Sequence, residues 1–111
     1  MNAMELAKVA KASLDDKLGE DIKVLDLRGL SNVADFFVIA SGKNPNHLRA
    51  MADDVEQKMY KAGEKLHHSE GYSGDTWILL DFGSVLVHLF NQESRGFYSL
   101  DHIWSDAKEV E

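Results

Sequence analysis

The sequence predicts an α/β fold of the α+β type, with one domain over residues 1–111 and an ordered core from about residue 4 to 104. We expect a mixed sheet of four to five strands that carries helices mainly on one face. Three observations predict this fold. Two stretches repeat apolar residues at helical spacing, several short runs are rich in β-branched and aromatic residues, and no linker interrupts them, since Pro45 is the only proline. A chain of 111 residues can bury one hydrophobic core and is too short for two.

The first element is expected to be an amphipathic helix over about residues 2–18, which Gly19 ends. A short strand follows at 22–27, and residues 30–34 form a turn or a single helical turn. Residues 35–40 (DFFVIA) are aromatic and β-branched, which predicts a buried strand. The apolar stripe of the helix consists of Leu6, Val9, Ala10 and Leu14.

A second helix is predicted to begin at Pro45, with Asn44 as its N-cap and Gly63 at its end. Proline suits the first helical turn because its missing N–H would have no helical partner there. A short strand at 67–70 is expected next. The apolar stripe of this helix consists of Leu48, Met51, Ala52, Val55 and Met59.

The last third of the chain contains the clearest strands, 77–81 and 84–90, joined by Phe82-Gly83. Residues 97–104 are expected to form a closing helical segment. The polar tail at 106–111 is expected to be frayed.

The strands 77–81 and 84–90 predict a hairpin with two different faces. If Phe82-Gly83 is a two-residue loop, Asp81 pairs with Ser84 and Trp77 lies opposite His88. Side chains alternate between the faces of a strand. The face that the helices must cover is then aliphatic, with Ile78, Leu80, Val85, Val87 and Leu89. The other face mixes large apolar and polar side chains, namely Trp77, Leu79, Asp81, Ser84, Leu86, His88 and Phe90.

This second face has the composition of a partner-binding patch, in which aromatic anchors are surrounded by hydrogen-bonding groups. The alternative is that helices cover both faces of the sheet, as in doubly wound folds. The sequence offers only two long helices, and two helices cover about one face of a four-stranded sheet. We therefore expect the Trp77 side of the hairpin to be exposed.

Composition narrows the class of function. The net charge is −7 with histidines neutral, which argues against direct sequence-specific binding of nucleic acid and favours a basic protein partner. The chain has no cysteine, so thiolate metal sites and thiol nucleophiles are excluded. No apolar run is long enough to span a bilayer, and the first residues do not read as a signal peptide. We predict a cytoplasmic protein that does not bind membranes.

Several patterns suggest catalytic or metal chemistry without supporting it. The tripeptide at 81–83 (DFG) matches a kinase motif, but the chain lacks the other kinase elements. Asp53 and Asp54 are neighbours on a predicted helix and point in different directions. His67 and His68 are neighbours on a strand and do not converge on a metal. Residues 41–44 (SGKN) precede a helix and could bind an anion, although a plain turn is the simpler interpretation. We expect no catalytic residue, cofactor or metal.

The ordered set of motifs is more specific than any one of them. In chain order they are VLDLR (24–28), ADFFVIASG (34–42), EG (70–71), WILLDFG (77–83), VHLF (87–90), RGFYSL (95–100) and Trp104. Together they resemble the ribosomal silencing factor family, also called Iojap-like, over about residues 4–104. The chain departs from the family pattern at Ser84, where Asp is frequent, and at Pro45, where small hydroxyl residues are usual.

The resemblance implies a fold similar to nucleotidyltransferases without their activity. It implies binding to the fourteenth protein of the large ribosomal subunit, at the surface that meets the small subunit. Members of the family block subunit joining, repress translation when nutrients are scarce, and tend to form homodimers when free. An active nucleotide-binding or nucleotidyltransferase enzyme is the alternative function. It would need paired carboxylates on a strand after a glycine turn, and Asp53 and Asp54 do not supply them.

The family pattern also implies functional positions. Five residues are characteristic of it, namely Trp77, Asp81, His88, Phe90 and Tyr98. In the predicted patch, Trp77 and Phe90 are the anchors, and Leu79 and Leu86 fill the space between them. Polar contacts at the rim are assigned to Asp81, His88, Glu70 and Tyr98.

Overall fold

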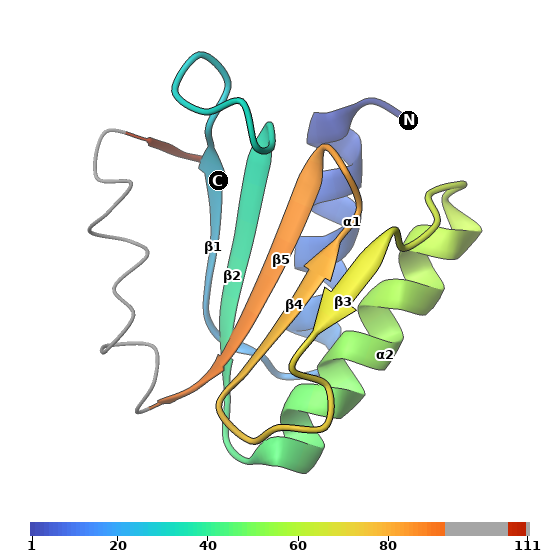
Figure 1. Ribbon diagram of the computed structural model, residues 1–111, viewed down its shortest axis with the longest axis vertical. Helices are drawn as coiled ribbons and strands as arrows, with labels where there is room; N and C mark the ends of the chain where they lie inside the picture. The colour runs from blue at the N-terminus through green and yellow to red at the C-terminus, as the bar shows by residue number, and fades with distance from the viewer. Residues whose placement is uncertain (93–106, 111) are drawn as a thin grey trace.

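The computed structural model describes residues 1–92 and 107–110, which form a mixed sheet with both helices on one face (Figure 1). The strand order is β3-β4-β5-β2-β1-β6. β2 and β5 are parallel neighbours, and the other pairs are antiparallel. In chain order the elements are α1 (Ala3–Asp16), β1 (Glu20–Asp26), β2 (Phe36–Gly42), α2 (Pro45–Lys61), β3 (His68–Glu70), β4 (Trp77–Asp81), β5 (Val85–Asn91) and β6 (Lys108–Val110).

The sheet contains six strands in the described residues, where the sequence predicted four to five. The additional strand is β6, in the tail expected to be frayed, where Val110 pairs with Val24 and Lys108 with Asp26. β6 is placed by backbone pairing with the outer edge of β1. Its side chains are mostly polar, so the sequence contained no strand signal there. The predicted helical segment at 97–104, which includes Tyr98, lies outside the described residues.

Both helices begin where the sequence predicted. Asn2 caps α1 by accepting the Glu5 N–H at 2.8 Å, and the Glu5 carboxylate accepts the Asn2 N–H in return. Asn44 caps α2 by accepting the His47 N–H at 2.8 Å, with Pro45 in the first turn. In the part of the chain that the structure describes, neither helix is long and apolar enough to cross a membrane.

The main hydrophobic core lies between the helices and the sheet. Every second side chain of the central strands points into it, as strand alternation requires. Its fully buried members come from all layers and include Leu14, Val24, Phe36, Val38, Leu48, Met51, Met59, Ile78, Leu80, Phe82, Val87 and Leu89.

A polar contact joins the two helices. The buried Ser13 hydroxyl on α1 donates to Asp54 Oδ2 on α2 at 2.5 Å, and Lys58 Nζ lies 3.2 Å from the same oxygen. Burial alone would raise the pKa of Asp54, but the bonds from Ser13 and Lys58 outweigh it and hold the pKa below its usual value. The carboxylate is therefore charged and satisfied at neutral pH.

Replacing Ser13 by alanine is expected to lower the free energy of unfolding by about 1–3 kcal/mol, because Asp54 keeps its charge but loses a buried donor. Urea denaturation at pH 7 measures the loss. Ser69→Ala, at an exposed position in β3, is the matched control and should change stability by less than about 0.5 kcal/mol. Equal effects of the two substitutions would contradict a role for the contact between the helices.

The register of the β4–β5 hairpin differs from the prediction by two residues. Asp81 pairs with Leu86 and Trp77 with Phe90, whereas the sequence predicted Asp81 with Ser84. The turn residues are Gly83 and Ser84, because the Phe82 N–H donates to the Val85 carbonyl at 2.9 Å. Gly83 has φ +87°, the conformation that a two-residue hairpin turn requires at its first position. A shift by two residues keeps every side chain on its predicted face.

Candidate partner-binding face

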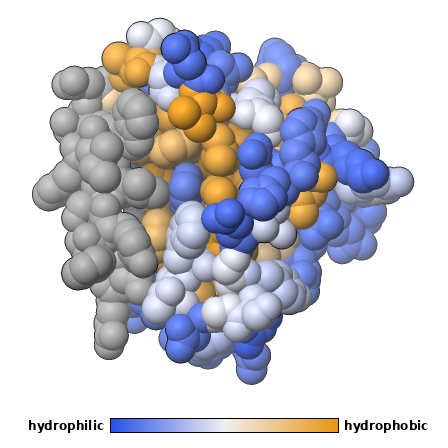
Figure 2. Space-filling model, viewed as in Figure 1, coloured by the Kyte–Doolittle hydropathy of each residue, from blue (hydrophilic) through white to orange (hydrophobic). Residues whose placement is uncertain are grey.

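The sheet surface turned away from the helices carries a second apolar cluster. We call it the aromatic face and define it by Leu25, Phe37, Ile39, Trp77, Leu79, Leu86, His88 and Phe90, from β1, β2, β4 and β5. Figure 2 shows hydrophobic residues gathered over the middle of this side of the molecule. The two-faced hairpin predicted from the sequence is confirmed. In β4, Ile78 and Leu80 belong to the main core, whereas Trp77 and Leu79 pack in the aromatic face.

The structure divides the predicted site residues into buried and accessible ones. Trp77 and Leu79 on β4 are half-buried, whereas Phe90 on β5 is only 2% exposed. His88 and Leu86 are buried as well, at 8% and 7% exposure. The prediction that this whole side of the hairpin is exposed is therefore wrong for β5.

β5 is an inner strand of the sheet. It lies between β4 and β2, so its side chains are flanked on both sides. On this face the neighbouring strand β2 contributes Phe37, whose ring centroid lies 4.6 Å from that of His88 in an edge-to-face arrangement. Sequence reasoning treated the hairpin in isolation and missed these lateral neighbours.

Three rings of the aromatic face lie in nearly parallel planes. The Trp77 and Phe90 rings are 6.4 Å apart between centroids with planes 23° apart, as expected for directly paired strand residues. The His88 and Phe90 rings are 6.2 Å apart with planes 4° apart. Half-buried Trp77 therefore rests on buried neighbours that hold it in place.

A hydrogen bond links Trp77 to His88. The indole Nε1–H donates to His88 Nδ1 at 3.3 Å. An indole nitrogen can only donate, so Nδ1 must be unprotonated and the neutral ring carries its hydrogen on Nε2. Nε2 is buried and has no hydrogen-bond partner in residues 1–92 and 107–110. A buried N–H without a partner costs about 1–3 kcal/mol of stability.

The environment of His88 keeps the ring neutral. Burial lowers the pKa of His88 from 6.5 to about 4, because the charged form would lose its hydration. At neutral pH the Nδ1 lone pair is therefore available to Trp77.

Asp81 and Glu70 lie at the margin of the aromatic face. Asp81 is half-buried, and its Oδ1 accepts the Gly83 N–H at 2.7 Å, so this carboxylate stabilises the hairpin turn. Glu70 on β3 is exposed and lies 3.1 Å from His68 Nε2. Tyr98 lies outside the described residues.

Gly71 fixes the backbone behind Trp77. A Cβ at this position would lie 2.0 Å from the Trp77 carbonyl oxygen, and Gly71 has φ +80°. Only glycine fits this close approach without moving β4. The glycine of the EG motif thus helps to place the indole.

Sequence reasoning missed Leu25, Phe37 and Ile39 as members of the aromatic face. The signal for the last two was the uninterrupted apolar run of residues 36–40, which indicates a strand buried on both sides. Phe36 and Val38 point to the helices, so Phe37 and Ile39 must point to the other face.

The residues considered for catalysis have structural partners instead. Asp53 accepts the Tyr72 hydroxyl at 3.0 Å, and Asp54 binds Ser13, so the two carboxylates face different neighbours. In the part of the chain that the structure describes, no three histidine or acidic side chains are grouped as metal ligands. Near the start of α2, the Lys43 N–H donates to His47 Nδ1, and Asp75 lines the adjacent groove. Lys43 lines the same groove, so its charge and that of Asp75 offset each other and leave no positive excess that would select an anion.

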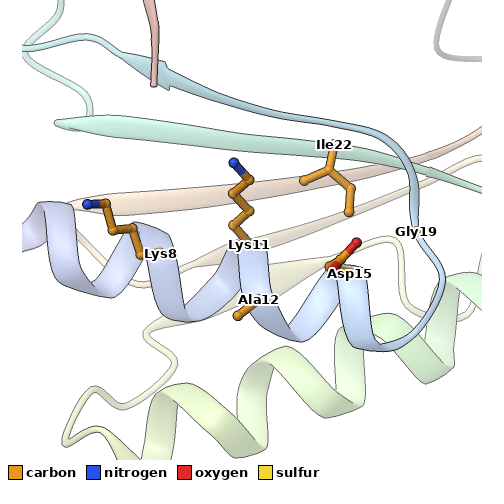
Figure 3. Close-up of a pocket in the computed structure, with 6 residues that line it drawn as sticks. All are labelled: Lys8, Lys11, Ala12, Asp15, Gly19 and Ile22. Atoms are coloured by element: carbon orange, nitrogen blue, oxygen red, sulfur yellow. The ribbon is translucent and has the colours of Figure 1, made fainter. Parts of the chain in front are cut away.

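A groove of about 520 Å³ lies elsewhere, between α1 and the start of β1 (Figure 3). Lys8, Lys11 and Asp15 project from α1, and Ile22 from β1 closes the far side. It contains none of the predicted site residues. Its mixed charges on one exposed helix surface do not define a ligand.

Comparison with known proteins identifies relatives over nearly the whole chain. Residues 1–111 match the family described as "RsfS: Ribosomal silencing factor during starvation". The ribosomal silencing factor RsfS of Bacillus subtilis is 37% identical over 107 residues, which are 96% of this chain and 91% of that protein. The chloroplastic protein Iojap of Zea mays is 38% identical over 107 residues, covering 93% of this chain and 44% of that protein.

Solved structures support the same relationship. A crystal structure of a protein from Chromobacterium violaceum has a TM-score of 0.90 at 33% identity, covering 95% of this chain and 88% of the other. A second crystal structure, from Bacillus halodurans, has a TM-score of 0.85 at 32% identity and covers 97% and 98% of the two chains. On the match over its full length, the chain belongs to the ribosomal silencing factor RsfS family, also represented by Iojap.

Proposed function

We propose that this protein is a ribosomal silencing factor that binds the fourteenth protein of the large ribosomal subunit and sterically prevents the small subunit from joining. Translation would thereby be repressed under nutrient limitation. The observation that carries the proposal is the match to the RsfS family over residues 1–111. The aromatic face supplies a physical means of binding, since Trp77 and Leu79 are half-buried and Trp77 packs beside buried Phe90.

Charge supports a partner that is a basic protein surface. The chain carries a net charge of −7, which steers it toward positive surfaces at long range and away from exposed RNA phosphates. Short-range affinity then comes from burial of the Trp77 and Leu79 side chains. Exposed Glu70 and half-buried Asp81 at the margin can pair with basic groups of the partner.

The proposed mechanism needs no catalysis, because occupying the surface that the small subunit must contact is sufficient. We accordingly propose a non-enzymatic, cytoplasmic regulator that needs no cofactor or metal. Its fold would resemble that of nucleotidyltransferases, but the protein would not catalyse their reaction. The aromatic face would also serve as a homodimer interface when the protein is free, so that a second copy and the ribosome compete for it.

An order-of-addition experiment tests steric blocking. Purified large subunits are incubated with the protein before small subunits are added, and joining is followed by light scattering and sedimentation. We expect joining to be inhibited in proportion to the occupied large subunits, and sedimentation of the free protein to show whether a dimer dissociates on binding. Unimpaired joining at saturating protein, with binding demonstrated in the same sample, would refute the proposal.

A further inference from the structure

We propose that His88 is a positioning residue of the partner-binding face, whose Nδ1 fixes the angle at which the Trp77 indole is presented to the partner. The inference rests on the proposed function, because it requires Trp77 to contact the large subunit. It adds a role for a buried residue that cannot itself provide a large contact area, since His88 is only 8% exposed.

The geometry of the two rings carries the inference. Indole Nε1 and His88 Nδ1 are 3.3 Å apart, while the ring centroids are 6.2 Å apart and the planes differ by 19°. The indole N–H bond and the Nδ1 lone pair both lie in their ring planes. The nearly parallel planes and the short separation bring the N–H edge of the indole to His88 Nδ1.

Packing alone would not set this angle. The contact between Trp77 and Phe90 fixes the plane of the indole, but ring contacts tolerate rotation and sliding within that plane. A hydrogen bond is directional and weakens steeply when the donor turns away. The bond to His88 therefore selects one in-plane orientation, and with it the edge of the indole that a partner meets.

His88 is itself held firmly enough to act as a fixed acceptor. The Phe37 ring packs edge-to-face against it at 4.6 Å, and Phe90 lies beside it in a parallel plane. The side chain is buried on β5, whose backbone pairs with strands on both sides. Orientation is thus transmitted from the sheet through His88 to half-buried Trp77.

A purely structural role explains His88 poorly. Its Nε2–H has no hydrogen-bond partner in the described ranges 1–92 and 107–110, so an apolar ring would pack here without an unsatisfied donor. A residue that lowers stability at such a position is expected where function benefits from it.

Two substitutions separate the ring from the acceptor. His88→Phe keeps a ring of similar size and removes the acceptor, whereas His88→Asn places an oxygen near the position of Nδ1 and removes the ring.

The measurements are affinity for purified large subunits, thermal unfolding, and the NMR signal of the Trp77 indole N–H, assigned by its absence in Trp77→Phe. We expect His88→Phe to shift the indole signal and weaken binding about tenfold while thermal stability is retained, the effect of losing about one hydrogen bond. His88→Asn should recover most of the affinity even where it lowers stability.

The outcomes distinguish this inference from the proposed function. An unchanged indole signal in His88→Phe, or a shifted signal with unchanged affinity, overturns the positioning role while Trp77→Ala still weakens binding. Loss of affinity in both His88 variants in proportion to their loss of stability also overturns it. If Trp77→Ala itself leaves affinity unchanged, the proposed binding face fails, and the role of His88 fails with it.

Discussion

Truncation of Trp77 to alanine is expected to weaken binding to the large subunit by about 30-fold or more, corresponding to about 2 kcal/mol or more for an aromatic anchor at the centre of an interface. The indole is the largest side chain of the aromatic face that is not fully buried, and its ring lies against Phe90. Removing it leaves a depression lined by side chains that are already covered. Equilibrium binding to purified large subunits measures the change.

Tyr60→Ala is the matched control, because Tyr60 is a 70% exposed aromatic residue on α2, on the other side of the sheet. It should leave affinity unchanged. Circular dichroism and thermal unfolding show that both variants are folded. If Trp77→Ala is folded and binds like the parent protein, or if both variants lose affinity equally, the aromatic face is not the docking surface.

Acidification is expected to destabilise the protein through His88. The pKa of His88 is 6.5 in the unfolded chain and about 4 in the folded protein, because burial disfavours the charged ring. As the pH falls below 6.5, the unfolded state binds a proton that the folded state does not, so the free energy of unfolding decreases. This loss is complete near pH 4 and amounts to about 3 kcal/mol. Above pH 6.5 the contribution of His88 does not change.

Urea denaturation at pH 7, 5.5 and 4 measures this dependence, with His88→Phe as the control. All other residues are common to the two proteins, so their contributions cancel in the comparison. The free energy of unfolding of the wild type, minus that of the variant, should decrease steadily as the pH falls from 6.5 to 4. Parallel stability curves for the two proteins would show that His88 is not held neutral inside the folded chain.

Local signals in the sequence predict much of the fold. The cap Asn44 and the stripe spacing of both helices predict α1 and α2 to within a few residues. Alternation along β4 and β5 sorts Leu80 and Trp77 onto opposite faces whatever the register. These features depend on neighbouring residues in the chain, which a sequence displays directly.

Features that depend on distant partners were mispredicted or missed. Phe82 is buried in the core and pairs with Val85, so it is not part of the turn. Gly83 and Ser84 are therefore the turn residues. β5 is an inner strand, so one strand beside Phe90 is β2, which lies outside the hairpin. The predicted register placed Trp77 directly opposite His88, whereas the two hydrogen-bonded residues are diagonal neighbours in the structure.

Parallel titration of binding and joining tests the central claim most directly. The concentrations of wild-type protein and of Trp77→Ala that half-saturate large subunits are compared with those that half-inhibit subunit joining. Blocking by occupation of the docking surface predicts that the substitution raises both concentrations by the same factor. A variant that loses affinity but still inhibits joining at the wild-type concentration would contradict this account.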